Sequence, residues 1–275
     1  MPELPEVETI VRGLRACLPG RRIQAVTIRQ PAILKTPPRR FIGCLLGAVI
    51  KDVRRFGKHI LLRMGRRGED RTCWLIVHLG MTGQLVVEPT RRAARRHTHA
   101  WLELEGGESL RFIDPRRFGR LRVTSGEDLP EELSRLGPEP LEIGAEDFVR
   151  RVRSRAAGMK SLLLDQRFLR GVGNIYADET LFRAGIHPAT PGRRISPKRA
   201  KNLWRAMRRV LQEAIALGGS SVSNYVDAAG QPGGFQFRHR VYGRAGQPCV
   251  NCGARLRRAI IAGRGTAWCP KCQRK

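Results

Sequence analysis

Lysine and acidic residues are both scarce in this chain. Lys and Arg together number 52, only eight of them lysine, against 24 Asp and Glu, so the formal net charge is +28 and the sequence pI is about 11.4. A positive charge left so unbalanced predicts a polyanionic partner. Nucleic acid is the first candidate, because cationic side chains neutralise its phosphates regardless of base sequence. The preference for arginine agrees with this, since its planar fork matches phosphate geometry.

Long apolar runs are also missing. No segment approaches the roughly 20 apolar residues that a transmembrane helix needs, and no basic amphipathic segment stands apart as an interfacial anchor. An acidic membrane surface is therefore disfavoured as the partner. The N-terminus lacks a basic stretch followed by an apolar one, so no signal peptide is expected and the compartment should be cytoplasmic.

The first half of the sequence predicts a helix followed by many short strands. With 275 residues, two domains are expected. Apolar residues at helical spacing over 7–18 predict a helix that ends at Pro19-Gly20. Eight β-rich runs follow, Gly106-Gly107 reading as a tight hairpin, and they favour a β-sandwich or flattened barrel. The runs are 23–28, 46–54, 59–64, 73–79, 84–87, 100–105, 109–113 and 121–124.

The second half is predicted to be helical. Residues 136–140 look like an interdomain linker. Helices are expected over 146–155, 158–165 and 175–184, and a long one from Ser196-Pro197 to Gly218-Gly219. Asn174 is the expected N-cap of the third helix, where free backbone amides bind phosphate. The loop over 218–237 is either a lid over a pocket or an ordinary connector.

The first eight residues, MPELPEVE, put a proline beside a carboxylic acid. If Met1 is removed, the chain begins with the secondary amine of Pro2. An α-amino group has a reference pKa of about 7.7–8.0, so part of it is unprotonated near neutral pH. Such an amine can form a Schiff base with an aldehyde-like carbon, and the carboxyl of Glu3 can shuttle protons. The alternative is that Pro2 and Pro5 only mark the start of a helix.

Cysteines near the C-terminus predict a metal site. Their spacing, C-x2-C-x16-C-x2-C, is typical of tetrahedral zinc in a ribbon or hairpin. All four ligands are thiolates, so one structural zinc ion is expected, not a catalytic one; two disulfides are the alternative, which a cytoplasmic setting disfavours. The ligands are Cys249, Cys252, Cys269 and Cys272. The remaining three, Cys17, Cys44 and Cys73, are expected to be small buried hydrophobes.

The segment over 255–266, between the two cysteine pairs, predicts a β-hairpin. Its apolar residues alternate with arginines, and Arg264 lies near a glycine-flanked bend. A zinc-stiffened hairpin of this kind can present arginines to DNA. A solvated basic face is the alternative for Arg257 and Arg258.

Five separated motifs resemble the formamidopyrimidine-DNA glycosylases, bacterial enzymes that remove 8-oxoguanine and have AP lyase activity. They are MPELPEVETIVRG at 1–13, HLGMTG at 78–83, DPRRFG at 114–119, GVGNIYA at 171–177 and the terminal cysteine hairpin. The resemblance covers the whole chain in order. It implies an α+β protein that acts as a monomer on double-stranded DNA containing oxidised purines, held in a cleft between two domains.

The resemblance also implies a domain layout. An N-terminal helix and β-sandwich form a catalytic domain over 1–132, followed by a linker over 133–145. A helix-two-turn-helix domain with a lesion-capping loop covers 146–238, and a zinc-finger β-hairpin covers 239–275.

Four residues receive catalytic roles from the resemblance. Pro2 is the nucleophile at C1′ of the damaged nucleotide, and Glu3 is the general acid for ring opening and base loss. Lys58 is assigned to β-elimination, although it could instead neutralise a phosphate. Arg264 is assigned to δ-elimination and phosphate contact; a guanidinium is a poor proton donor, so the phosphate-orienting role is favoured.

Other positions match DNA-binding residues of the family. Met81, Arg116 and Phe118 would fill the hole that a flipped nucleotide leaves, with Arg116 bonding the orphaned cytosine; core packing is the alternative for the two apolar residues. The positions that match backbone-holding residues are His78, His97, Arg155, Lys160 and Asn174.

Two other readings compete with this one. Endonuclease VIII-like glycosylases share the Pro-Glu chemistry but prefer oxidised pyrimidines; the MPELPE start and the long loop favour the purine-specific branch. A non-catalytic zinc-ribbon protein that binds nucleic acid would explain the charge and the cysteines but not the N-terminal motif.

Overall fold

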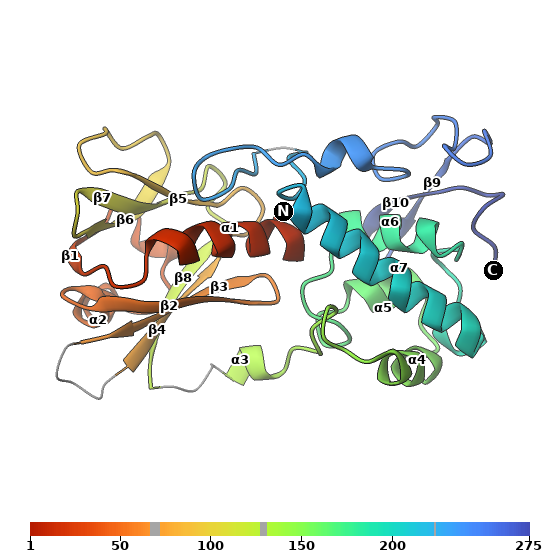
Figure 1. Cartoon of the computed structure of the whole chain (residues 1–275), viewed down its shortest axis with the longest axis horizontal. Helices are drawn as coiled ribbons and strands as arrows, with labels where there is room; N and C mark the ends of the chain where they lie inside the picture. The colour runs from red at the N-terminus through yellow and green to blue at the C-terminus, as the bar shows by residue number, and fades with distance from the viewer. Residues whose placement is uncertain (67–71, 127–130, 223) are drawn as a thin grey trace. The chain divides into compact units, whose positions relative to one another are not determined.

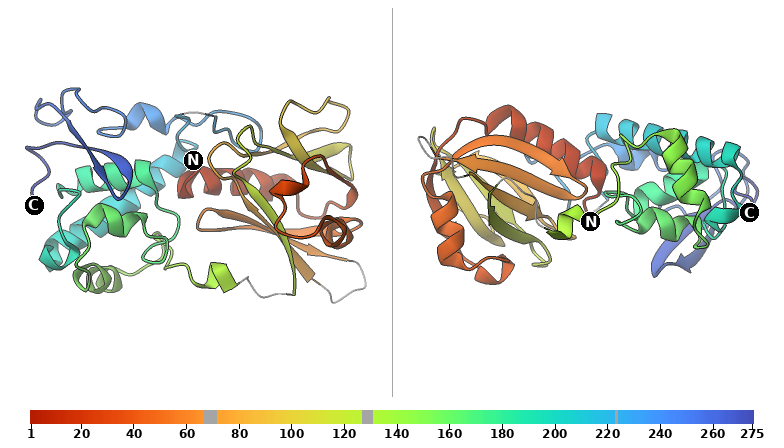
Figure 2. Two further views of the ribbon diagram at one scale, coloured as in Figure 1. Left: turned by 180° about the vertical axis from the view of Figure 1, so that it is seen from behind. Right: turned by 90° about the horizontal axis from the view of Figure 1, so that it is seen from below.

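The computed structural model describes residues 1–66, 72–126, 131–222 and 224–275 (Figures 1 and 2). The chain forms two compact units. The first contains Met1–Ser134 and Leu217–Gly234, and the second contains Arg135–Ala216 and Phe235–Lys275. Among the described helices, none combines the length and the apolar content needed to cross a membrane.

The first unit contains a β-sandwich behind an N-terminal helix, as predicted. One antiparallel sheet has the order β1-β6-β7-β5, and the other has the order β2-β3-β4-β8. These strands are β1 (Ile23–Ile28), β2 (Val49–Phe56), β3 (His59–Gly65), β4 (Thr72–His78), β5 (Gln84–Pro89), β6 (Thr98–Leu104), β7 (Glu108–Ile113) and β8 (Arg120–Ser125). Each coincides with an expected run to within a few residues. The hairpin between β6 and β7 turns at Gly106 and Gly107, which both have positive φ.

Helix α1 (Leu4–Cys17) supplies one wall of the core between the sheets. Val7, Ile10, Val11 and Leu14 are fully buried in the same apolar cluster as the strand interiors, which is the stripe that the sequence predicts. The short elements η1 (Pro31–Ile33), α2 (Pro38–Leu45) and α3 (Glu131–Ser134) were not expected. Helix α2 buries only Phe41 and Leu45, too few to show a helical period in the sequence.

The second unit is helical and ends in a two-stranded hairpin. Its elements are α4 (Ala145–Arg153), α5 (Met159–Leu164), α6 (Asn174–Arg183), η2 (Gly192–Arg194), α7 (Pro197–Ala216), η3 (Phe235–Arg238), β9 (Arg257–Ile261) and β10 (Arg264–Trp268). These confirm the expected helices and hairpin. The expected N-cap is wrong by one residue: Gly173 caps α6, and Asn174 is its first helical residue. The Asn174 side chain reaches the hairpin instead, its Nδ2 donating to the Gly265 carbonyl at 3.1 Å.

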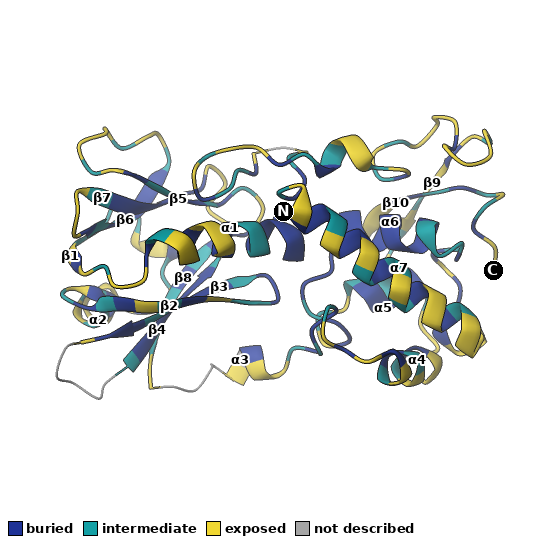
Figure 3. Cartoon of the chain, in the orientation of Figure 1, coloured by how far each residue is buried: buried dark blue, intermediate teal, exposed yellow. Residues whose placement is uncertain are grey.

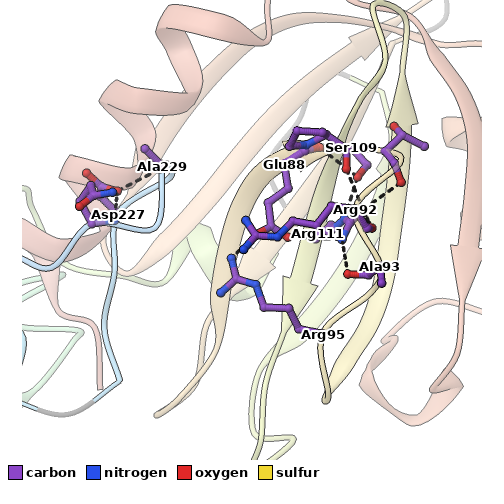
Figure 4. A network of polar contacts seen from close by, with 11 residues as sticks. Glu88, Arg92, Ala93, Arg95, Ser109, Arg111, Asp227 and Ala229 are labelled. Atoms are coloured by element: carbon purple, nitrogen blue, oxygen red, sulfur yellow. Dashed lines mark hydrogen bonds and ion pairs between the residues drawn. The ribbon is translucent and has the colours of Figure 1, made fainter.

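The loop after α7 groups with the β-sandwich unit, whereas the sequence placed it within the helical domain over 146–238. Its contacts explain the difference. The Val87 N–H donates to the Ala228 carbonyl at 3.0 Å, and the Gln84 side chain donates to the Asn224 carbonyl at 2.6 Å. Within the loop, Asp227 accepts hydrogen bonds from the backbone of Ala229 and Gln231 (Figure 4).

A buried arginine shapes the loop between β5 and β6 (Figure 4). Arg111 is 3% exposed and forms an ion pair with Glu88 at 3.3 Å. Its guanidinium also donates to four backbone carbonyls of the loop, those of Pro89, Thr90, Arg92 and Ala93. One side chain thus bonds main-chain acceptors at the end of β5 and in the residues that follow it, on the path leading to His97.

Candidate active site and nucleic-acid-binding loops

The N-terminal Pro-Glu pair is held by the first turn of α1. Pro2 and Glu3 are buried, and Glu3 is the N-cap residue. The Glu3 side chain accepts a hydrogen bond from the Glu6 backbone, while the Glu3 N–H donates to Glu6 Oε2 at 2.8 Å. This reciprocal capping box fixes the Glu3 carboxyl at the positive end of the helix, immediately beside Pro2.

Glu6 also joins the helix to the loop after α7. Its Oε1 accepts the Ser220 N–H at 2.8 Å, and the Tyr225 hydroxyl lies 3.3 Å from the Glu6 carbonyl and 3.0 Å from that of Gly218. Burial raises the pKa of Tyr225, so its hydroxyl stays protonated. Gly219 has φ +81°, and a Cβ there would lie 2.9 Å from Glu6 Oε1. The loop therefore begins against the turn that carries Glu3.

Lys58 lies in the turn between β2 and β3, next to two histidines. It follows Gly57, which has φ +58°, and is 8% exposed. His59 and His78 are paired across β3 and β4 with ring centroids 4.9 Å apart. Burial lowers the pKa of His78 to about 4, and that of His59 is lowered by the same cause, with the Lys58 charge contributing to both. Both imidazoles are therefore neutral at pH 7 beside the ammonium group.

The His78 tautomer follows from its neighbour. The Gly80 N–H donates to His78 Nδ1 at 3.2 Å. Since a neutral imidazole carries one proton, that proton lies on Nε2. His78 is thus a neutral hydrogen-bond donor, suited to a phosphate oxygen.

The two turns that carry Met81 and Phe118 are joined through Asp114. The Thr82 hydroxyl donates to Asp114 Oδ1 at 2.5 Å, and the Gly119 N–H donates to Oδ2 at 2.7 Å. Asp114 is fully buried, so these bonds replace its lost hydration. Sequence analysis quoted Asp114 within a motif but gave it no role.

Close backbone approach explains the glycines of these turns. Gly80 has φ +62°, and a Cβ there would lie 2.6 Å from the Gly119 nitrogen. A Cβ on Gly119 would lie 2.5 Å from the Phe112 ring. Any larger residue at either position would force the turns apart.

The predicted wedge residues are exposed rather than packed in the core. Met81 is 37% exposed and Phe118 is 49% exposed. The Arg116 guanidinium lies 4.7 Å from the centre of the Phe118 ring, within cation–π range. The core-packing alternative therefore fails for both apolar residues. His97 lies close by with φ +66°, its carbonyl accepting the Asp114 N–H at 3.0 Å.

In the second unit, two predicted residues, Lys160 and Asn174, meet at the hairpin. Lys160 is fully buried; its Nζ donates to Asp178 Oδ1 at 2.7 Å and to the Gly265 carbonyl at 3.2 Å. Asp178 Oδ2 accepts the Ala267 N–H at 3.1 Å. Asn174 bonds the same Gly265 carbonyl, and its buried Oδ1 has no hydrogen-bond partner in the described structure. Asp178, which sequence analysis missed, thus positions both the lysine and the hairpin.

Arg264 and Arg155 are solvent-exposed. Arg264 begins β10 directly after a tight turn in which Ala262 and Gly263 have positive φ. Arg155 follows α4, and its carbonyl accepts the Arg193 N–H at 2.7 Å. Both guanidinium groups can therefore reach a ligand in solution.

The four C-terminal cysteines form a compact cluster. Their Sγ atoms all lie within 4.8 Å of one another, with Cys249 and Cys272 at 3.9 Å and Cys252 and Cys269 at 3.5 Å. Tetrahedral zinc with about 2.3 Å Zn–S bonds requires sulfur separations of about 3.8 Å. Backbone N–H groups of Asn251 and Cys272 also reach sulfurs of the cluster. Four thiolates at these separations fit one zinc ion. All seven cysteines of the chain are free, so the structure does not support the alternative of two disulfides.

Comparison with known proteins identifies the family. The formamidopyrimidine-DNA glycosylase N-terminal domain matches residues 1–121, the H2TH domain of the same enzymes matches 136–226, and the zinc finger found in FPG and IleRS matches 246–274. A formamidopyrimidine-DNA glycosylase of Solibacter usitatus is 48% identical over 276 residues, covering 100% of both chains. The chain belongs to the formamidopyrimidine-DNA glycosylase family.

Solved structures of formamidopyrimidine-DNA glycosylases match the whole fold. The MutM (Fpg) protein of Thermus thermophilus is 46% identical with a TM-score of 0.86, covering 99% of this chain and 98% of that one. A Lactococcus lactis Fpg mutant, solved with DNA containing Fapy-dG, is 33% identical with a TM-score of 0.92 and 100% coverage of both chains. Members of this glycosylase family are DNA glycosylases with AP lyase activity.

The family also settles the metal question. The C-terminal segment is a zinc finger of the formamidopyrimidine-DNA glycosylase type, and its cysteine cluster holds one structural zinc ion. The three cysteines outside it differ in burial: Cys73 is buried as expected, whereas Cys17 and Cys44 are half-buried at the edge of the core.

Proposed function

We propose that the chain removes oxidised purines, such as 8-oxoguanine and formamidopyrimidines, from double-stranded DNA and then cuts the strand. The proposal is carried by one arrangement, the Glu3 carboxyl fixed at the start of α1 beside Pro2. Family membership supports it, as do relatives solved with DNA containing Fapy-dG or an abasic site. The protein works as a monomer in the cytoplasm, on the chromosome.

In the first step the Pro2 nitrogen bonds to C1′ of the flipped nucleotide. The C1′–O4′ bond opens as Glu3 gives its proton to O4′, and the base leaves with a proton as the C1′–N bond breaks. A cationic Schiff base, an iminium with no N–H proton, remains on Pro2, because the proton of the secondary amine has left with the base. Met1 must be absent for this, because a retained methionine would convert the Pro2 nitrogen into an amide.

In the second step the Schiff base acidifies the C2′ hydrogens. Lys58, in the turn after β2, accepts one of these protons while the 3′ phosphate leaves. Loss of a C4′ proton then releases the 5′ phosphate, which Arg264 orients. His59 and His78 are neutral, so they add no further positive charge beside Lys58.

Binding of the damaged strand is assigned to exposed residues, most of them on two turns, and to further residues that are partly or fully buried. Met81 and Phe118 enter the space left by the flipped nucleotide, and Arg116 bonds the orphaned cytosine. His78, His97, Arg155, Lys160 and Asn174 hold the backbone. Because Lys160 is fully buried against Asp178, it acts by placing the Gly265 carbonyl and the hairpin rather than as an exposed cation.

Borohydride trapping tests the chemistry. Incubation with duplex DNA carrying 8-oxoguanine opposite cytosine, with borohydride present, should give a covalent adduct that peptide mass spectrometry maps to Pro2. The intact mass of the same preparation should lack Met1. An adduct at another residue, or an active enzyme that retains Met1, would refute Pro2 as the nucleophile.

Substrate choice is tested separately. Excision of 8-oxoguanine should be at least tenfold faster than excision of thymine glycol from matched duplexes. The reverse order would assign the chain to the chemistry of endonuclease VIII-like enzymes while leaving the Schiff base intact.

A further inference from the structure

An arginine-lined hollow of about 380 Å³ lies in the second unit, at the C-terminal end of α6. It is separate from the predicted phosphate-holding residue Asn174, which begins the same helix: ten residues of α-helix place its two ends about 14 Å apart. Helix α7 contributes Asn202, Arg205, Ala206 and Arg209 to the lining, and Figure 3 shows that this helix has an exposed face. The charged and polar lining residues are Arg183, Arg205, Arg209, Arg240, Asn202 and Asn251.

Arg183 supplies a buried donor group to this hollow. Its side chain is only 10% exposed, and its Nη1 forms an ion pair with Glu213 of α7. The other two guanidinium nitrogens, Nε and Nη2, are buried and have no hydrogen-bond partner in the described structure. Buried donors without acceptors are unfavourable, and each one calls for an explanation, of which a water or ion that completes the bond is one. An anion bound in the hollow would supply acceptors to Arg183.

The other charged residues that line the hollow are also arginines. The guanidinium groups of Arg205, Arg209 and Arg240 form no ion pair with any described residue. The Arg205 Nη1 donates to Asn202 Oδ1 at 3.0 Å, which turns it along the α7 surface. Four cations therefore face one hollow, and Glu213, already paired with Arg183, is the acid beside them. Arginine forks bind phosphate oxygens in pairs.

We propose that this hollow binds a small phosphate-bearing anion of diphosphate size, either free or as the diphosphate of a nucleotide. A volume of about 380 Å³ lies within the range of small-ligand pockets. A duplex backbone is held by contacts spaced along a strand, whereas here the donors converge on one concavity with Arg183 at its wall.

The test titrates inorganic pyrophosphate into the full-length zinc-loaded protein by isothermal calorimetry. Arg205→Gln/Arg209→Gln removes two exposed guanidinium groups from the hollow and should weaken pyrophosphate binding at least tenfold. Arg153→Gln/Arg194→Gln removes the same charge from exposed positions of the same unit outside the hollow, and should change the affinity less than twofold. Equal affinities for the wild type and both variants would overturn the proposal.

A substitution of Arg183 tests the proposal independently. Arg183→Lys keeps a cation opposite Glu213 but removes the fork, so it should lose pyrophosphate affinity with its melting temperature close to that of the wild type. Replacing pyrophosphate with adenosine diphosphate distinguishes the sources: tighter binding indicates a nucleotide, and equal binding a free diphosphate. If the Arg205/Arg209 variant loses affinity for undamaged duplex while pyrophosphate binding is unchanged, the arginines belong to a DNA-binding tract and the proposal is wrong.

Discussion

Thr82 donates a hydrogen bond to Asp114, with 2.5 Å between Oγ1 and Oδ1, across 32 positions of sequence. Through it the turn carrying Met81 and the turn carrying Phe118 behave as one rigid part. The wedge residues need that support because they are exposed apolar groups with little packing of their own.

Replacing Thr82 tests this coupling. Thr82→Val removes the donor and leaves the buried Asp114 with one fewer partner, so we expect about 1–3 kcal/mol less stability and weaker binding of lesion-containing duplex. Thr82→Ser keeps the hydroxyl and should stay near the wild type. Chemical denaturation and fluorescence anisotropy measure the two effects. Similar behaviour of the two variants would show that the hydroxyl is not what joins the turns.

Glu3→Gln should separate base loss from Schiff-base formation. The amide oxygen can still accept the capping hydrogen bond, so the melting temperature should change little. The general acid is lost, and excision of 8-oxoguanine should fall by about 10²-fold or more. On abasic-site DNA, where the base has already left, borohydride trapping should persist. Equal loss on both substrates would mean that Glu3 acts mainly by holding Pro2.

Zinc removal should disable the second unit before the first. Cys249 and Cys269 lie in one apolar cluster with Phe182 of α6, so losing the metal loosens the packing beneath the hairpin. A strong chelator should release one zinc per chain and abolish DNA binding. Cys252→Ser should reproduce this effect, whereas Cys17→Ser, outside the cluster, should keep full zinc content by elemental analysis. Unchanged DNA binding after complete zinc loss would contradict the structural role.

His78 should make the fold sensitive to acid. Its pKa is lowered to about 4 in the folded state, from 6.5 when unperturbed, so the unfolded chain binds the extra proton between these values. The stability contributed by neutral His78 is therefore fully present above pH 6.5 and is lost as the pH falls towards 4. His78→Gln should lose less stability than the wild type between pH 7 and pH 5 in urea titrations. Parallel losses would argue against a buried neutral imidazole.

Most of the fold could be predicted from local patterns in the sequence. The strands are short β-rich runs separated by turn residues, the β6–β7 hairpin has glycines at positive φ, and α1 has a complete apolar stripe, so each could be predicted from a short window. Helix α2 could not, because only Phe41 and Leu45 of this helix are buried.

The buried contacts that position the site residues join positions far apart in the sequence, so a short stretch of sequence does not reveal them. Lys160 meets Asp178 18 positions away, and Glu6 meets the Ser220 amide 214 positions away. No local period encodes a pairing of this kind. Motifs could name the proposed site residues, whereas partners such as Asp178 and the Ser220 amide, which place them, became visible only in the folded chain.

The hydrogen bonds of Arg111 affect which amino-acid substitutions the β5–β6 loop can tolerate. It holds the loop through main-chain carbonyls, which every amino acid possesses, and not through the loop's own side chains. The four bonds to Arg111 are thus indifferent to the identity of the side chains that follow β5. Among the loop's own side chains, Arg92 and Arg95 add ion pairs to Glu88, the same carboxylate that pairs with Arg111. A change of Arg111, in the following hairpin, would therefore remove all four main-chain bonds at once and one of the partners of Glu88.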